Sequence, residues 1–550
     1  MEKSFNERTQ VIRKIILFSV FLNFAISQTI SAYNTEWQWS TSLNALVSNE
    51  TKNHPQAFLW IPSNCKQVRA VIVGNHNMTE ETLLENPEFR KAMSNLGFAE
   101  IWITPGLDMK WDIEIGTQQI FETMMKEFAT ISGYSELEYA PIVPVGHSAM
   151  ATYPWNFAAW NPERTLAILS VHGDAPQTNL TGYGKANLDW GKRTVDDIPG
   201  LMIEGEWEWW EDRVTPALTY RMKHPASPVS FLCDAGRGHF DISDQLVHYV
   251  TLFLEKAAQY RLPKRMPLNK PCQLIPVVPQ QGWLAERWKT DGIVREKPAP
   301  YTQYKGNPAD AFWYFDKEMA LATEKIYARG RGKKQQYIGI LQKGKLVDFH
   351  QNTHARIKAQ FKPEGEEELT FHLKAVFTDS LRAKQVNEHA MGKPRIDRIC
   401  GPVKKLNDST FQISFYRMGM MNTKRTNDIW LLASHDGDEN YKSSVQQLEL
   451  VIPYRLTEGK AQNISFAPLK NVKRGCKSVA LTATSDCGLP IHYYIEEGPA
   501  EIKDGKILFT KISPRAKLPL KVTVVAWQYG RSIASKVQTA EPVAQSFCIE

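Results

Sequence analysis

The feature that most constrains this chain is an alternation of short apolar runs and amphipathic segments of helical length between residues 56 and 260. The apolar runs cover residues 56–62, 68–74, 99–104, 141–146, 165–171, 200–204 and 228–234. Helical spacing of apolar side chains predicts helices over 87–96, 116–132 and 244–260, and a further helix from residue 149. Apolar strands that alternate with helices are typical of a mostly parallel sheet covered on both faces. The sequence therefore predicts an α/β domain over residues 33–265.

The pattern changes after residue 265. Repeated prolines indicate an extended linker within 266–349, and the segment 308–328 has the composition of a helix with aromatic residues at its start. From about residue 350, polar and apolar residues alternate between turn signals, which is typical of β-sandwich material. We predict one β-sandwich domain over 350–460 and an immunoglobulin-like β domain over 461–550.

The first 32 residues have the pattern of an export signal. Lys3, Arg8, Arg13 and Lys14 precede an apolar run over 15–26, and Ile30-Ser31-Ala32 offers a small-residue cleavage site. An earlier cut after Ser27 and an uncleaved anchor are the alternatives. We predict a secreted protein, periplasmic or extracellular, without stable membrane insertion after cleavage, since no later run is long and apolar enough to span a bilayer.

Composition narrows the classes of partner and cofactor. The 550 residues are 43% hydrophobic and 23% charged, as in ordinary globular proteins, with a formal net charge of +7. This mild excess is compatible with an anionic substrate or with a solvated basic surface, and the lack of a basic run with interleaved aromatics argues against nucleic acid. The seven cysteines form no C-x-x-C pair, and no metal or nucleotide motif occurs, so we expect no cofactor. Cys476 and Cys487 either pair or remain free.

The motif with the most chemical content is Gly146-His147-Ser148-Ala149-Met150, placed between a predicted strand and a predicted helix. A G-x-S-x-G turn at this junction lifts a serine hydroxyl above the carboxyl ends of the strands in the α/β-hydrolase fold. Here Met150 replaces the second glycine, so either the local packing is looser or Met150 points aside. We predict the α/β-hydrolase fold with Ser148 as nucleophile; the alternative is an ordinary serine in a tight turn.

A serine nucleophile needs a base, which an acid orients. His239, flanked by Gly238 and Phe240, follows the last predicted strand and is the expected base. The acid should follow the preceding strand, and its spacing from the strand end selects Glu208. Glu206, Asp212 and Asp174 remain competing candidates.

The oxyanion of a reaction intermediate needs two converging N–H donors. The backbone N–H of Ala149, directly after the nucleophile, is the first expected donor. The loop after the strand over 68–74 should supply the second donor, from Asn77 or Met78. The alternative is that this loop has only a turn role.

Aromatic residues near the predicted site suggest a sugar substrate. Trp155 follows the nucleophile, while Trp209 and Trp210 lie close to the predicted acid, and indole faces stack on sugar rings. Arg237 could place a guanidinium beside a substrate carboxylate. Core packing for the tryptophans and an ion pair for the arginine are the alternatives.

Several segments together resemble a family of secreted gut-bacterial carbohydrate esterases with the α/β-hydrolase fold, which includes the pectin methylesterase acting on rhamnogalacturonan-II. The similar segments are 146–151, 153–155, 238–241, 256–263, 310–320, 484–494 and 524–530. The resemblance implies removal of methyl esters from galacturonate in plant cell-wall polysaccharide, with Ser148, His239 and Glu208 as the triad.

Three classes of function remain distinct at this point. The first is a serine carboxylic-ester hydrolase acting on pectin methyl esters, or otherwise on acetyl or feruloyl esters of plant polysaccharide. A peptidase or lipase could use the same serine turn, because the fold alone does not fix the substrate. A glycan-binding protein with an inactive hydrolase fold is the third, against which the complete set of triad residues argues.

Overall fold

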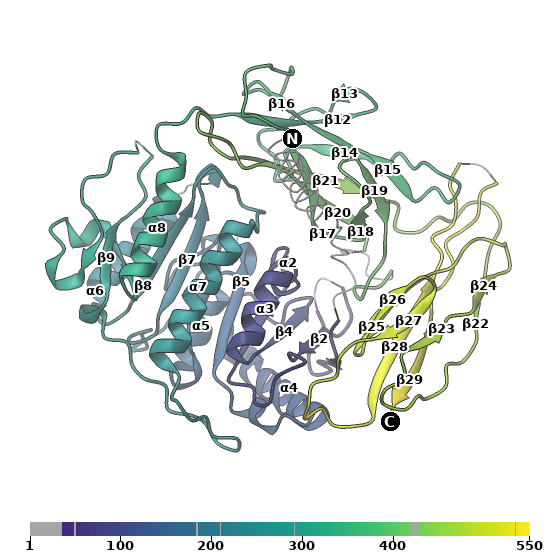
Figure 1. Ribbon diagram of the computed structural model, residues 1–550, viewed down its shortest axis with the longest axis horizontal. Helices are drawn as coiled ribbons and strands as arrows, with labels where there is room; N and C mark the ends of the chain where they lie inside the picture. Colours follow the sequence, from purple (N-terminus) through teal and green to yellow (C-terminus); the bar gives the residue numbers. More distant parts are fainter. Residues whose placement is uncertain are drawn as a thin grey trace, which may run out of the picture.

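An eight-stranded sheet forms the centre of the first half of the chain in the computed structural model (Figure 1). The structure describes residues 36–48, 51–182, 185–208, 211–290, 292–420, 426–533 and 535–550, so the leader predicted over 1–32 lies outside the described residues. The strands are β1 Trp39–Ser42, β2 Gln56–Trp60, β3 Ala70–Asn75, β4 Phe98–Thr104, β5 Ile142–His147, β6 Ile168–Val171, β7 Gly200–Gly205 and β8 Val229–Asp234.

The strand order identifies the fold. Across the sheet the order is β1-β2-β4-β3-β5-β6-β7-β8. Strand β2 pairs antiparallel with β1 and β4, and every pair from β4 to β8 is parallel. This is the α/β-hydrolase fold, and the predicted fold class is confirmed.

Helices cover both faces of the sheet. They are α2 Glu80–Leu84, α3 Pro87–Leu96, α4 Thr117–Ser132, α5 Tyr153–Trp160, α6 Glu211–Lys223 and α7 Asp244–Arg261. The apolar sides of α3 and α7 belong to one core and that of α4 to another. The helix predicted from residue 149 begins later: Ser148–Met150 is a separate 3₁₀ turn, and α5 begins at Tyr153 with Pro154 in its first turn, a favoured proline position.

The segment 266–349 departs from the predicted linker and helix. Strands β9 Trp283–Glu286, β10 Ala299–Pro300 and β11 Ala311–Tyr314 form a small antiparallel sheet, and helix α8 spans Lys317–Gly330. The aromatic start of the predicted 308–328 helix is therefore strand β11, whose residues are all buried and pair with β9. The helix starts only after Asp316, whose side chain caps it by accepting from Met319 N at 3.0 Å.

Small, mostly antiparallel sheets make up the rest of the described chain, consistent with the predicted β-sandwich modules. The first β module comprises β12 Tyr337–Gln342, β13 Lys345–Leu346, β14 Lys358–Gln360, β15 Thr370–His372, β16 Lys374–Thr378, β17 Arg395–Cys400, β18 Val403–Lys405, β19 Thr410–Ile413, β20 Asp428–His435 and β21 Ser444–Val451. The second comprises β22 Ile464–Phe466, β23 Ser478–Ala480, β24 Ala483–Ser485, β25 His492–Glu497, β26 Ala500–Lys503, β27 Lys506–Phe509, β28 Leu520–Trp527 and β29 Val543–Ile549. The pair β14–β21 is the one parallel pair among these named strands. The domain boundaries at 265, 349 and 460 stay predictions.

Both β modules pack on the hydrolase domain, at different places (Figure 1). The second module shares a large apolar core with α4 and β1. The first module meets the loops at the carboxyl ends of the strands, where Met78 and Phe240 pack with Ala355, Trp430 and Val445. The first module therefore lies directly beside the region where the predicted nucleophile should sit.

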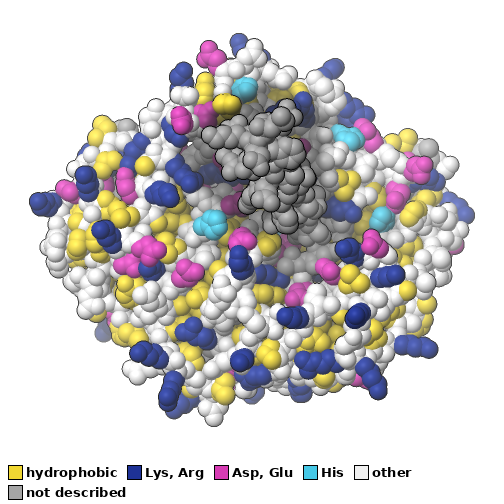
Figure 2. Space-filling view, viewed as in Figure 1, with side chains coloured by type: hydrophobic (Ala, Val, Ile, Leu, Met, Phe, Trp, Pro, Cys, Tyr) yellow, Lys and Arg dark blue, Asp and Glu magenta, His cyan; other side chains and the backbone are white. Residues whose placement is uncertain are grey.

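Three further properties of the described residues are their surface charge, the state of their cysteines and the apolarity of their helices. Figure 2 shows basic and acidic side chains interspersed over the visible face. All seven cysteines are free, so the Cys476–Cys487 pairing left open by the sequence does not form. Within the described part of the chain, none of the helices combines the length and apolarity needed to cross a bilayer.

Candidate active site

Ser148 occupies a strained turn between β5 and α5. Its backbone has φ of 51°, a left-handed conformation that costs a residue with a side chain of order 1–3 kcal/mol and that is concentrated at functional sites. The turn is tight enough that a Cβ at Gly146 would lie 1.9 Å from the carbonyl oxygen of Met150. Glycine at 146 is therefore required for this geometry, which points the serine away from the strand.

Met150, the residue that departs from the G-x-S-x-G pattern, points aside. Its terminal methyl lies against Gly106, where an added Cβ would come within 2.4 Å of it. The close approach expected at the second glycine is instead made by the next residue, since a Cβ at Gly173 would lie 1.8 Å from the Ala151 Cβ. The sequence left two alternatives, looser local packing or a Met150 side chain that points aside, and the structure shows a side chain that points aside.

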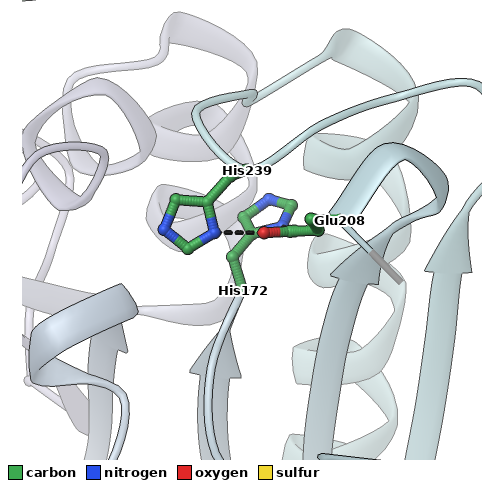
Figure 3. Close-up of side chains that lie close together, drawn as sticks. All are labelled: His172, Glu208 and His239. Carbon is green, nitrogen blue, oxygen red and sulfur yellow. Dashed lines mark hydrogen bonds and ion pairs between the residues drawn. The ribbon is translucent and has the colours of Figure 1, made fainter. Parts of the chain in front are cut away.

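Ser148, His239 and Glu208 form a continuous hydrogen-bond chain. The Ser148 Oγ lies 2.7 Å from His239 Nε2, and His239 Nδ1 hydrogen-bonds to Glu208 Oε2 (Figure 3). Each residue follows a different strand: Ser148 follows β5, Glu208 ends the short turn after β7, and His239 lies between β8 and α7. The structure thus brings together the three residues predicted as nucleophile, acid and base.

The competing acids are engaged elsewhere. Glu206 accepts from Lys442 Nζ at 2.5 Å and from Gly236 N at 2.7 Å. Asp174 is fully buried and accepts from the hydroxyls of Thr152 and Thr181, each at 2.5 Å. Asp212 is exposed at the start of α6. Glu208 is the one of the four that hydrogen-bonds to His239 in the described structure.

His172 is a fourth member of this cluster that the sequence analysis missed. It directly follows β6, with φ of 49°, and its Nδ1 hydrogen-bonds to the second carboxylate oxygen of Glu208. Glu208 therefore lies between two imidazoles (Figure 3). A signal was present, because His172 stands at the carboxyl end of the strand next to β5, where side chains of parallel sheets converge.

Both ring nitrogens of His172 face acceptors. Nδ1 meets Glu208, and Nε2 lies 3.3 Å from the Asp241 carbonyl oxygen. Burial alone would lower the pKa of His172, but the charge and hydrogen bond of Glu208 outweigh burial and raise it. Two acceptors around the ring and a raised pKa both favour the protonated form of His172, in which both ring nitrogens donate.

Electrostatics keep Glu208 ionised and His239 neutral. Burial favours the protonated form of Glu208, but His239 and His172 together hold its pKa well below the ordinary value. Burial lowers the pKa of His239, and the charge of His172 lowers it further against the opposing pull of Glu208. A neutral imidazole next to a serine hydroxyl can accept a proton, as general-base chemistry requires.

His147, between Gly146 and Ser148, supports the base and is not part of the hydrogen-bond chain of the triad. Its ring is fully buried and its Nε2 donates to the His239 carbonyl oxygen at 2.8 Å. Asn77 Nδ2 lies 3.3 Å from His147 Nδ1, which therefore accepts. Burial holds the pKa of His147 well below its usual value, so it fixes the backbone of the base as a neutral group.

The predicted oxyanion donors in the loop after β3 are already used. The backbone N–H groups of Asn77 and Met78 donate to the Glu80 carboxylate, at 2.9 and 3.0 Å. The same carboxylate accepts from His147 N at 2.7 Å. The prediction that Asn77 or Met78 supplies the second N–H does not hold for this conformation, because Glu80 directs both amides to itself. Ala149, in the turn after Ser148, keeps the position expected of the first donor.

Two predicted substrate contacts are wrong and two fall outside the described residues. Trp155 is 1% exposed and its Nε1 donates to the Asp174 carbonyl at 2.7 Å, so it belongs to the core. Arg237 is 4% exposed, with its guanidinium bound to Asp241 and, at 3.3 Å, to Asp436 of the first β module. It is an ion-pair partner, not a free anion receptor. Trp209 and Trp210 lie outside the described residues.

The three side chains of Figure 3 are also a set that could hold a metal ion. His172, Glu208 and His239 offer ligand atoms that all lie within 4.8 Å of one another. In the present geometry, each carboxylate oxygen of Glu208 accepts from an imidazole Nδ1, and Oε1 also accepts from Gly205 N at 2.8 Å. The three groups thus satisfy one another through hydrogen bonds, with Glu208 holding both imidazoles in place.

Comparison with known proteins gives distant structural likeness. No family model and no curated protein matches the sequence. Among solved structures, the chain is similar to a thermostable esterase (10% identity, TM-score 0.25), covering 36% of this chain and 54% of the other. It is also similar to a dienelactone hydrolase from Anabaena variabilis, with 14% identity and a TM-score of 0.27, over 42% of this chain and 100% of the other. A third similar structure is an S-formylglutathione hydrolase from Agrobacterium tumefaciens, with 13% identity and a TM-score of 0.28, over 40% of this chain and 94% of the other. The strand order of this chain, rather than these likenesses, identifies its fold.

Proposed function

We propose that this protein is a serine carboxylic-ester hydrolase that works through an acyl-enzyme. The observation that carries the proposal is the 2.7 Å contact between Ser148 Oγ and His239 Nε2, in a chain that ends on the ionised carboxylate of Glu208. A serine hydroxyl is a weak nucleophile until a base accepts its proton, and this arrangement supplies the base and its orienting acid. An inert glycan-binding fold would have no need of such an arrangement of nucleophile, base and acid.

The proposed reaction has two halves. In the first, Ser148 Oγ attacks the ester carbonyl carbon while its proton passes to His239 Nε2. The ester C–O bond then breaks, and the imidazolium returns the proton to the leaving alkoxide, which departs as an alcohol. In the second, His239 takes a proton from water as the water oxygen attacks the acyl carbon. The acyl C–Oγ bond then breaks, and the imidazolium returns the proton to Ser148 Oγ, which leaves a free carboxylic acid.

Two groups would stabilise the charge that develops in these steps. Glu208 stabilises the imidazolium through Nδ1 and fixes the ring in the tautomer whose Nε2 accepts. The Ala149 N–H lies next to the nucleophile and would donate to the oxyanion.

The substrate we propose is a methyl ester of galacturonate in pectin-like plant polysaccharide. The support is the resemblance of the serine turn, the histidine loop and the C-terminal segments to the esterase family that includes the rhamnogalacturonan-II pectin methylesterase. The proposal also includes export to the periplasm or the cell exterior, following the leader pattern over 1–32. Acetyl and feruloyl esters are the nearest competing substrates.

A release assay on pectic polysaccharide tests both levels of the proposal. The wild-type protein should release methanol, and the Ser148→Ala variant should release none above the uncatalysed rate. Release of acetate without methanol would overturn the methyl-ester assignment while leaving an esterase. Methanol release by Ser148→Ala at the wild-type rate would remove Ser148 from the mechanism.

A further inference from the structure

The first β module contributes one wall of the candidate active site. Its loop over 350–356 places the His354 ring 5.7 Å from that of His239 and 4.9 Å from that of Phe240. The Gln447 side chain of β21 holds this loop by donating to the His354 carbonyl oxygen at 3.1 Å. A residue more than 100 positions downstream in sequence therefore touches the proposed base.

A small pocket of about 40 Å³ lies at this junction. The hydrolase domain lines it with Trp207, Glu208, Gly238 and His239, and the first β module lines it with Tyr337, Arg356, Arg382, Ser444, Val445 and Gln447. A water molecule takes about 30 Å³ of liquid volume, so the pocket has room for one small polar group and none for a sugar ring. Such a group would lie beside the triad acid and base.

Local contacts hold the two arginines of this pocket, and both arginines have a left-handed backbone. Arg356 and Arg382 have φ of 62° and 56°, in the left-handed region that residues with side chains seldom adopt. Arg356 N donates to Thr353 Oγ1 at 3.0 Å, and its carbonyl accepts from His350 N at 2.7 Å. The Arg382 guanidinium is stacked over the rings of Tyr337 and Phe349, at 4.6 and 4.5 Å.

Neither of these two guanidinium groups lies within ion-pair distance of a carboxylate in the described part of the chain; Asp379 acts on Arg382 only from further away. The Arg382 Nη1 donates to the Ser380 carbonyl oxygen, whereas its Nε–H is buried without a hydrogen-bond acceptor. Glu208, the acid that lines the pocket, already binds two imidazoles. Burial lowers the pKa of Arg382 to about 10, and the positive charge of Arg356 acts in the same direction against the opposing effects of Tyr337 and Asp379, so two like charges lie close together.

We propose that Arg356 and Arg382 form an anion subsite that binds a free carboxylate of the substrate beside the ester under attack. Planar carboxylates match the donor geometry of guanidinium groups, and charged hydrogen bonds are the strong ones. The inference rests on the hydrolase function proposed above and refines its substrate: an ester whose neighbouring uronate is already ionised. Partly de-esterified galacturonan is then a better substrate than the fully methylated polymer.

Selectivity between these two polymers is the direct test. The ratio of kcat/KM for partly de-esterified over fully methylated galacturonan should exceed one in the wild type. In Arg356→Gln and in Arg382→Gln this ratio should fall by about tenfold or more, because each variant loses a charged hydrogen bond. Arg356→Lys should retain part of the preference. Arg193→Gln, which alters an arginine stacked on Trp160 outside this pocket, should leave the ratio unchanged.

A binding measurement separates this inference from the hydrolase proposal. Calorimetry with the Ser148→Ala protein and unesterified trigalacturonate should show binding that weakens in the Ser148→Ala/Arg356→Gln double variant. Equal binding by both proteins, or an unchanged selectivity ratio in the two arginine variants, would overturn the anion subsite even if the wild type hydrolyses esters. Trigalacturonate binding that needs Arg356, in a protein that hydrolyses no ester, would retain the anion site and overturn the hydrolase proposal.

Discussion

Glu208 is the residue on which the chemistry of the site converges. One of its oxygens meets His239 and the other meets His172, and Gly205 N–H donates to the same side as His172. A carboxylate held by three donors stays ionised and cannot rotate, so it fixes both the position and the tautomer of the base.

Replacing Glu208 by glutamine should therefore reduce kcat by a factor of about 10⁴, since the amide cannot hold the imidazole in the required tautomer. The measurement is steady-state kinetics on a chromogenic ester. Asp212→Asn, a change of the same kind at the exposed start of α6, should leave kcat within about twofold. A loss of less than tenfold in Glu208→Gln would assign the acid's role to a different carboxylate.

His172 should set the pH range of activity. It faces Glu208 and the Asp241 carbonyl, its ring lies 5.7 and 5.8 Å from those of His147 and His239, and its carbonyl oxygen accepts from Arg213. Because its positive charge helps to lower the pKa of His239, a neutral His172→Gln should let that pKa rise.

The base is active when neutral, so the acidic limb of the kcat/KM profile should move to higher pH in His172→Gln. The exposed His248 on α7 provides the control, and His248→Gln should leave the profile in place. A His172→Gln profile that superimposes on the wild type, with reduced stability as the sole effect, would mean that His172 has only a structural role.

At the scale of elements, the turn between β5 and α5 decides whether the nucleophile is presented at all. Gly146→Ala would place a Cβ 1.9 Å from the Met150 carbonyl oxygen, a backbone atom that cannot move without opening the turn. We expect loss of most activity and a lowered melting temperature. Gly116→Ala, where an added Cβ meets nothing within 4 Å, should cost only about 1 kcal/mol of backbone strain and keep its activity. Equal activities in the two variants would contradict this account of the turn.

Local sequence patterns predicted the elements that depend on local information. The buried strands β3, β4, β5 and β8 each read as an apolar run, and Ser148, Glu208 and His239 follow strand ends at typical spacings. The start of α5 and the 311–314 strand were missed, because a strained serine turn and pairing with β9 override helix-like composition.

The wrong predictions at the site have a common cause: tertiary contacts, which local sequence patterns do not encode, decide what each side chain binds. Trp155 and Arg237 have the chemistry of ligand contacts, but one fills the core and the other finds acid partners on the loop and on the first β module. The Asn77 and Met78 amides are taken by a carboxylate from the following helix, α2. Arg356 and Arg382 reach the site from a separate module, a placement that no pattern within the first 265 residues encodes.

At the scale of the whole molecule, buried ion pairs join the first β module to α2 of the hydrolase domain. Arg398 Nη2 lies 3.3 Å from Glu81 Oε1, Arg417 pairs with Glu85, and Tyr416 donates to Glu81 at 3.2 Å. Glu81 and Arg398 have side-chain exposures of 1% and 4%. Helix α2, which makes these contacts, directly follows the loop that carries Asn77 and Met78. Packing of the first β module against α2 is therefore coupled to the conformation of this loop at the site.

Arg398→Met should consequently destabilise the protein by about 3–5 kcal/mol, because it leaves the Glu81 charge buried without its main partner. Denaturant titration followed by tryptophan fluorescence measures this change. Arg395→Met removes an exposed pair with Asp436 in the same module and should cost about 0–1 kcal/mol. Equal free energies of unfolding for the two variants would contradict the claim that the buried ion pairs contribute more to stability than the exposed pair.

The most direct test of the central claim is covalent labelling of the nucleophile. Incubation with a fluorophosphonate, followed by peptide mass mapping, should place a single phosphonyl group on Ser148 of the wild-type protein. The label should be absent from Ser148→Ala and much slower to form in His239→Ala, because the serine is activated only through the imidazole. A label on another residue, or an equal rate of labelling without His239, would contradict the account.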